Sequence, residues 1–136
     1  MSDDSKPKYV YKLIPSSSLV PEHAQLPDAL PVSDLDQSSG FIHLSTATQV
    51  PGTLKFFFKD VSRVYVLRIV YDKVEDKIRW EDPQAQVCGA RGGEGVFPHL
   101  YNGLRLGKDE VERVETLEKG DDDWGQAVHS ASWLVW

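Results

Sequence analysis

The stretch Arg63-Val-Tyr-Val-Leu-Arg-Ile-Val-Tyr71 is the clearest β-strand signal in the chain. Most of its residues are β-branched, aliphatic or aromatic, and apolar side chains occupy both of the faces that alternate along a strand. A strand that is apolar on both faces is typical of the middle of a sheet, so we expect residues 63–71 to be central. Arg68 interrupts the run and needs a partner, which is either a buried carboxylate or a ligand anion.

Further strands are expected on both sides of this stretch, at residues 9–14, 41–44, 77–81 and 96–104. Four prolines between residues 15 and 39 allow only short helical turns there, and residues 38–40 read as a turn. A helix capped by Ser45 or Thr46 is expected to run to about Phe58. Residues 82–96 form a loop by their glycine content, and a helical turn near Asp109 precedes a last strand.

Length and composition indicate one domain, since 136 residues with 40% hydrophobic content can bury an ordinary core. Residues 1–8 are polar and are predicted to be disordered. Residues 9–118 form the predicted domain, and residues 119–136 form an acidic, tryptophan-rich tail. Exposed tryptophan is costly in water, so the tail is expected to dock on the domain, on a protein partner or on a second copy.

The charge distribution argues against a duplex nucleic acid partner. Residues 109–123 hold eight acidic residues against Arg113 and Lys119, so this stretch accounts for the whole net charge of −6. The rest of the chain is balanced and offers no basic surface for phosphates.

No apolar run is long enough to span a membrane, and the first residues lack the features of a signal peptide. With Cys88 as the single cysteine, we expect a cytoplasmic protein that is not membrane-bound.

Two short segments carry a histidine among apolar residues: Gly40-Phe-Ile-His-Leu-Ser-Thr46 and Phe97-Pro-His-Leu-Tyr101. Strand alternation would place Phe41, His43 and Ser45 on one face. A histidine in such surroundings is either hydrogen-bonded in the core or placed in a cleft, and both alternatives stay open. If the two segments converge, His43 and His99 would share one site.

These segments, with Gln49 and the intervening Arg79-Trp-Glu81, make the chain similar to the domain of unknown function 952 (DUF952) family over residues 9–118. Here Asn102 separates the tyrosine from Gly103, whereas the family pattern usually has glycine directly after it. The resemblance implies an ADP-ribosyltransferase-like fold, a compact α+β domain with a split, mainly antiparallel sheet across which NAD would lie. It also implies that His43 and Ser45 hold a ribose. Glu81 or a later residue would supply a carboxylate, and Tyr101 or Tyr71 an aromatic ring.

The chemistry implied by this resemblance is cleavage of the nicotinamide–ribose bond, which builds positive charge on the sugar. A carboxylate near the ribose and groups that hold its hydroxyls would stabilise that charge. The candidate catalytic residues are His43, Glu81 and His99. The candidate ligand-binding residues are Ser45, Thr46, Arg68, Arg79 and Tyr101.

Each candidate also has an ordinary structural explanation. Ser45 and Thr46 could simply cap a helix, Glu81 could pair with Arg79 at a strand end, and Tyr101 could only pack its ring. His43, His99 and Glu81 would suffice for a metal site, but no metal-binding spacing supports one and no metal is expected. Two functions therefore stay open: an NAD-dependent ADP-ribosyltransferase-like enzyme, or a non-catalytic module that binds a nucleotide-like small molecule.

Overall fold

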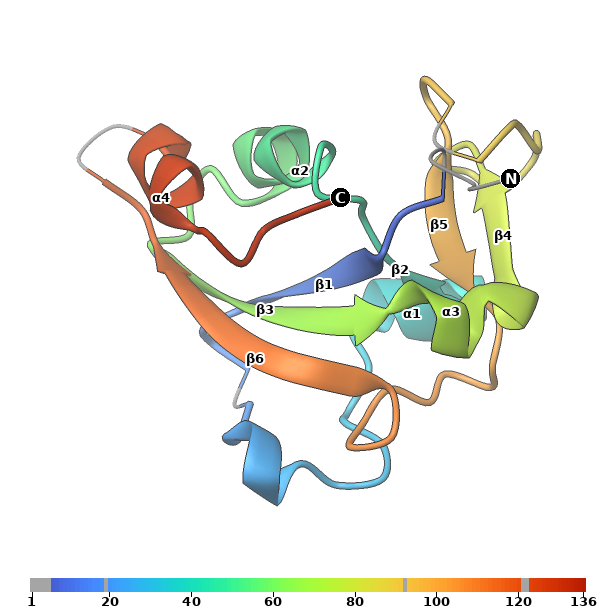
Figure 1. The fold of residues 1–136 in the computed structure, drawn as a ribbon, viewed down its shortest axis with the longest axis horizontal. Helices are drawn as coiled ribbons and strands as arrows, with labels where there is room; N and C mark the ends of the chain where they lie inside the picture. Colours follow the sequence, from blue (N-terminus) through green and yellow to red (C-terminus); the bar gives the residue numbers. More distant parts are fainter. Residues whose placement is uncertain (1–5, 19, 92, 121–122) are drawn as a thin grey trace.

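Two three-stranded antiparallel sheets carry the fold (Figure 1). The computed structural model describes residues 6–18, 20–91, 93–120 and 123–136. In the first sheet the strand order is β1 (Tyr9–Pro15), β3 (Arg63–Val70) and β6 (Val111–Glu118). In the second sheet it is β2 (Ile42–His43), β5 (Phe97–Leu100) and β4 (Ile78–Glu81). The α+β class with antiparallel sheets is therefore confirmed.

The helices are short and lie around the two sheets. They are η1 (His23–Gln25), α1 (Asp34–Ser39), α2 (Val50–Phe57), α3 (Tyr71–Val74), η2 (Glu75–Lys77) and α4 (Gly125–Ser130). Helices α2 and α4 lie beside each other above one face of the first sheet (Figure 1). Within the described ranges, none of the helices has the length and apolar character needed to cross a membrane.

Strand β3 is central, as its two apolar faces predict, and each face packs on a different core. Val64 and Val66 lie in the core beneath α2 and α4. Leu67 and Ile69 lie in the core shared with the second sheet. The alternation of side chains along a strand separates the two sets, so β3 connects both cores.

The second sheet presents one apolar and one polar face. Ile42, Trp80 and Leu100 contribute to the core that contains Leu67 and Ile69. In the same strands, the residues on the opposite face include the two histidines: His43 pairs with His99 across β2 and β5, and Arg79 pairs with His99 across β4 and β5. The strand register thus places three polar residues in one row.

The helix after β2 begins later than predicted. Ser45 is still extended, because its N–H and carbonyl both pair with Tyr11 at 2.8 Å. A turn follows in which the Thr46 carbonyl accepts from Gln49 and Val50, and α2 starts only at Val50. The predicted cap at Ser45 or Thr46 is therefore wrong, because β-bridging holds Ser45 outside the helix.

Two other boundaries also differ from the prediction. Residues 38 and 39 are not a turn but the last residues of α1, which Gly40 ends in the left-handed conformation at φ 80°. The strand expected at 96–104 stops at Leu100. Beyond Leu100 the Asn102 side chain closes a turn, because its Nδ2 donates to the Arg105 carbonyl and its Oδ1 accepts from the Arg105 N–H.

The C-terminal segment lies along the first sheet. The Tyr11 hydroxyl donates to the Val135 carbonyl at 2.8 Å and accepts from the Val135 N–H at 3.0 Å. Trp124 is buried, and its Nε1–H donates to the Phe58 carbonyl at 3.2 Å. Of the segment expected to be disordered, residues 1–5 lie outside the described part, whereas Lys6 forms ion pairs with Asp72 and Glu75.

Candidate functional site

His43 and His99 converge on one place. They are direct cross-strand neighbours, their ring centroids lie 5.1 Å apart, and the rings meet edge to face at 61°. Strands β2 and β5 hold them there because their neighbours Ile42 and Leu100 are fully buried on the opposite face. The two histidine segments thus form one cluster, not two separate core positions.

A buried carboxylate holds His43. Asp36, on α1, accepts from the Nδ1 atom of His43 at 2.7 Å and from its backbone N–H at 3.3 Å. The other oxygen of Asp36 pairs with the Lys12 Nζ atom at 2.6 Å, and Lys12 also donates to the His43 carbonyl at 3.3 Å. The N-cap Ser33 holds the start of α1, because its hydroxyl accepts from the Asp36 N–H. Three elements therefore position His43.

A second carboxylate holds His99 in the same way. Glu81, on β4, accepts from the Nδ1 atom of His99 at 3.0 Å and from the Tyr101 hydroxyl at 2.6 Å, both through Oε1. Burial, followed by the hydrogen bond to Glu81, raises the pKa of Tyr101 to about 12, so its hydroxyl stays protonated and donates. Glu81 does not form the ion pair with Arg79 that was considered from the sequence. Glu81 is buried, whereas Arg79 is exposed and its guanidinium lies 4.7 Å from the centre of the Tyr101 ring.

The two carboxylates determine which nitrogen of each ring carries a proton. Because an ionised carboxylate can only accept, an imidazole that is neutral and bonded to it through Nδ1 carries its proton there and has Nε2 as an acceptor. For Asp36, burial acts to raise the pKa, but the hydrogen bonds from His43 and the charge of Lys12 outweigh it and lower the pKa. Burial is also the main cause that lowers the pKa of His99, which favours its neutral form. Among the described residues, neither Nε2 atom has a protein hydrogen bond at the cluster.

Aromatic packing closes most of the cluster. The Phe41 ring stacks on His99 at 4.3 Å between centroids and also contacts His43 at 4.5 Å and Tyr101 at 5.0 Å. Phe41, Glu81 and His99 are buried, with at most 4% of each residue exposed. The His43 side chain is 24% exposed, Tyr101 is half-buried and Arg79 is exposed. The cluster is therefore reached from solvent at His43, Tyr101 and Arg79.

Three of the predicted residues do not join this cluster through their side chains. The Ser45 hydroxyl pairs with Thr53 at 3.2 Å, and the Thr46 hydroxyl pairs with Thr48 at 3.0 Å. Arg68 lies in the first sheet, where it forms a bidentate ion pair with Glu112 at 2.7 and 3.0 Å. The carboxylate alternative for Arg68 is thus the one that forms, and Glu112 is its partner.

Sequence reasoning missed Asp36, Lys12 and Phe41 as members of the cluster. Asp36 lies in a stretch that reads as a proline-punctuated loop, and no local pattern links it to His43. Strand alternation does place Phe41 on the same face as His43, but this pattern alone did not mark it as a site residue. Lys12 carried no signal, since a single lysine in a strand ordinarily points to solvent.

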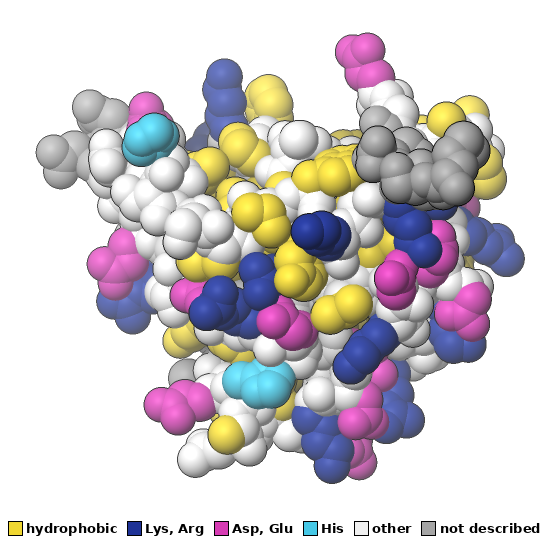
Figure 2. Space-filling model, viewed as in Figure 1, with side chains coloured by type: hydrophobic (Ala, Val, Ile, Leu, Met, Phe, Trp, Pro, Cys, Tyr) yellow, Lys and Arg dark blue, Asp and Glu magenta, His cyan; other side chains and the backbone are white. Residues whose placement is uncertain are grey.

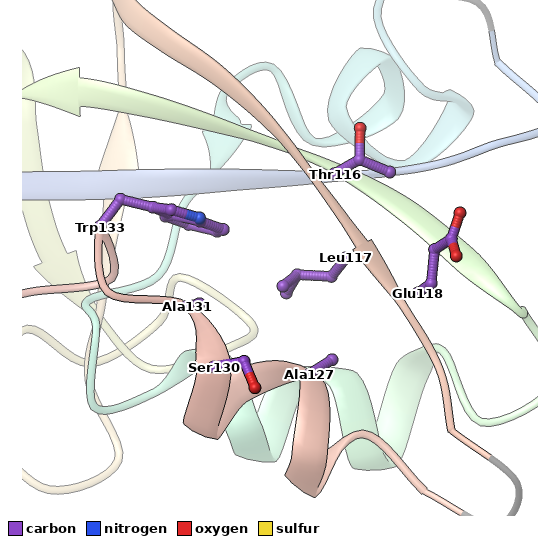
Figure 3. A pocket seen from close by; sticks show the side chains of 7 residues that line it. All are labelled: Thr116, Leu117, Glu118, Ala127, Ser130, Ala131 and Trp133. Atoms are coloured by element: carbon purple, nitrogen blue, oxygen red, sulfur yellow. The ribbon is translucent and has the colours of Figure 1, made fainter.

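Two cavities lie away from the histidines, beside the C-terminal helix. One of about 350 Å³ lies between β6 and α4, where Leu117 points towards the helix and Trp133 lies at one end (Figure 3). The other, of about 470 Å³, lies between α2 and α4. In the part of the chain that the structure describes, no group of three or more His, Cys, Asp or Glu side chains is arranged to hold a metal ion.

Solved structures with the same fold come from a bacterial protein. The crystal structure of protein CC0527 from Caulobacter crescentus has a TM-score of 0.65 and 27% sequence identity, over 89% of this chain and 98% of that one. The solution NMR structure of CC0527 has a TM-score of 0.64 and 26% identity, over 91% and 97% of the two chains. No curated protein matches the sequence. These similarities support the α+β fold, but none of them supports an ADP-ribosyltransferase-like assignment.

A protein-family comparison covers most of the chain. Residues 20–114 match the family described as "Protein of unknown function (DUF952)". The match spans α1, both histidine segments and Glu81, which build the cluster apart from Lys12 on β1. The chain therefore belongs to the DUF952 family.

Proposed function

We propose that the cluster of His43, His99, Glu81 and Tyr101 binds a nucleotide-like ligand and acts on the nicotinamide–ribose bond of NAD. The observation that carries this proposal is the pair of imidazoles, 5.1 Å apart, each held through Nδ1 by a carboxylate. Such an arrangement leaves Nε2 of each imidazole as an acceptor, and His43 is the more exposed of the two rings. A hydroxyl group of the ribose, or of the molecule that attacks it, is a donor that suits such an acceptor.

Arg79 supports the choice of an anionic ligand. Its guanidinium lies against the Tyr101 ring and forms no ion pair among the described residues. The Tyr101 ring is in turn held by the hydrogen bond to Glu81. A planar guanidinium of this kind is suited to phosphate oxygens, which NAD and ADP-ribose both carry.

The proposed reaction needs little proton transfer before the bond breaks. The C–N bond of the nicotinamide riboside breaks, its electron pair leaves with neutral nicotinamide, and the ribose becomes oxocarbenium-like. An acceptor hydroxyl, with water as the simplest case, then forms a bond to the same carbon. The Nε2 atom of His43 takes the proton of that hydroxyl, because His43 is the more exposed of the two imidazoles. The buried Glu81 carboxylate contributes negative charge near the sugar.

The second candidate function is binding without turnover. The burial of Phe41, Glu81 and His99 favours it, because a ligand that must reach His99 has to displace the Phe41 ring. A ligand that contacts only His43, Tyr101 and Arg79 would bind at the surface of the cluster. The Glu81 carboxylate would then stay covered.

Incubation with NAD, with nicotinamide release followed by chromatography, separates the two functions. The His43→Ala variant is compared with His129→Ala, which removes an exposed histidine on α4 as a matched control. The enzyme proposal expects release that His43→Ala abolishes and His129→Ala leaves unchanged. Calorimetric binding of ADP-ribose that depends on His43, without any release of nicotinamide, would establish the binding module instead. If neither ligand binds, both proposals are wrong.

A further inference from the structure

The cavity between α2 and α4 combines an apolar floor with a basic rim. Its volume is about 470 Å³, within the range of about 300–1,000 Å³ that is typical of small-molecule pockets. Of the residues that line it, the buried Trp124 and the half-buried Val128 form the apolar floor, and the exposed Pro51, Lys55 and Lys59 form the rim together with Lys119. Figure 2 shows hydrophobic side chains gathered on the face of the molecule that carries these helices.

The rim lysines are not neutralised by neighbouring carboxylates. In the described ranges, none of Lys55, Lys59 and Lys119 forms an ion pair. The Lys119 ammonium donates to the Lys59 carbonyl, which holds two of the lysines together. Asp123 also lines the cavity, but its Oδ1 atom accepts from the Gly125 N–H at 3.0 Å. Among the described residues that line the cavity, three are cations and one is a carboxylate.

We infer that this cavity binds a small amphiphilic anion, meaning an apolar chain or ring that carries one carboxylate or phosphate group. The apolar part would lie over the buried Trp124 and would remove from water the exposed surface of Pro51 and Val128. The anionic group would lie at the rim, where lysine side chains can reach it while their aliphatic stems line the entrance. This site is separate from the histidine cluster and does not depend on the function proposed for it.

The C-terminal segment of the chain forms one side of this cavity. The family match ends at residue 114, whereas Lys119, Trp124 and Val128 form one side of the cavity. Residues 123–136 lie against the first sheet and so complete the pocket. The ligand site therefore depends on a segment that lies outside the matched region.

Two exposed phenylalanines on α2 suggest a rival occupant, an anionic membrane surface. Phe56 is 70% exposed and Phe57 is 76% exposed, beside Lys55 and Lys59. A flat lipid surface could contact these rings, but it could not cover Trp124, which is only 5% exposed at the floor of the recess. The recess favours a monomeric ligand over a bilayer.

Titration of the full chain with decanoate, below the concentration at which it forms micelles, tests the site. The indole N–H signal of Trp124 in a ¹H–¹⁵N spectrum reports on the cavity floor, and calorimetry gives the affinity. Lys55→Gln/Lys59→Gln is the test variant, and Lys73→Gln, an exposed lysine on α3, is the control. Neither change touches a buried side chain, so both proteins are expected to fold.

We expect saturable binding that shifts the Trp124 signal and is about five- to tenfold weaker in the double variant but unchanged in the control. Decanol, which lacks the charge, is expected to bind the double variant and the original chain alike. The inference is overturned if decanoate causes no saturable shift, or if the double variant binds as tightly as the original chain. It is also overturned if the protein binds phosphatidylglycerol vesicles through Phe56 and Phe57 but not monomeric decanoate.

Discussion

Asp36 is the carboxylate whose loss the structure predicts to be most costly. Its side chain is 2% exposed and accepts hydrogen bonds from the Lys12 ammonium, the His43 ring and the His43 backbone. In Asp36→Asn the charge is removed while the shape is kept. The single amide oxygen can face either Lys12 or His43, so one of these two donors would meet an NH2 group, and Lys12, whose side chain is 12% exposed, loses its charge partner in either case.

The magnitude follows from the burial of this pair. Removing one partner of a buried ion pair costs about 3–5 kcal/mol, because the other charge stays buried without compensation. That is a large part of the roughly 5–15 kcal/mol by which an ordinary domain is stable. Since about 1 kcal/mol shifts the melting temperature of a domain this size by roughly 3–5 °C, we expect a decrease of about 10–20 °C.

Urea unfolding at pH 7 measures the effect, with Asp34→Asn as the matched control. Asp34 is an exposed carboxylate on the same helix, so its substitution is expected to cost less than about 0.5 kcal/mol. As a second readout, the ¹⁵N shifts of the His43 ring are expected to show a proton on Nδ1 in the original chain. In Asp36→Asn this preference is expected to be lost, because an amide can donate as well as accept.

The dependence on pH gives a further test of the reasoning. The pKa of Asp36 is lowered in the folded state, so its contribution is fully present above the unfolded pKa of about 3.9 and is lost as the pH falls through the folded value. The difference in stability between the original chain and Asp36→Asn should therefore shrink below about pH 4. A cost equal to that of Asp34→Asn, or a difference that is the same at pH 3 as at pH 7, would refute the argument.

Three further predictions concern other buried features. Burial lowers the pKa of His99, so its contribution to the free energy of unfolding should be fully present above the unfolded pKa of about 6.5 and should fall as the pH drops below that value. His99→Gln should flatten the plot of unfolding free energy against pH in this window. An unchanged slope would contradict the argument. Arg68→Gln removes the pair with Glu112 and the bond to the Trp133 carbonyl, and should cost about 2–4 kcal/mol and speed proteolysis of the C-terminal segment. An unchanged cleavage rate would show that Arg68 does not hold this segment. In Gly107→Ala the added Cβ would overlap the backbone of residues 27 and 28, at a cost of about 2 kcal/mol. In Gly52→Ala, on α2, the added Cβ has no atom within contact distance, and the better helix propensity of alanine should stabilise the protein by up to about 1 kcal/mol. Equal unfolding free energies for these two variants would exclude the steric argument.

Sequence patterns predicted the part of the site that depends on strand alternation. Phe41 and His43 share a face because they are two residues apart in an extended segment, and the same holds for His99 and Tyr101. Glu81 was predicted as a candidate from the resemblance, and its hydrogen bonds to His99 and Tyr101 place it in the cluster. Arg68 was correctly seen to need a partner, although its position in the strand could not tell a carboxylate from a ligand.

Local patterns in the chain therefore predict the central strand at residues 63–70, the two histidine-bearing strands and the family to which they belong. Which charged side chains meet is fixed by packing between elements that are distant in the chain. Lys12, Asp36 and His43 come from β1, α1 and β2, and their contact depends on how a helix after a proline-rich loop meets one strand of each sheet. Periodicity is a property of neighbouring residues and can be read along the chain. The choice of ion-pair and hydrogen-bond partners depends on distances across the fold, which no local pattern encodes.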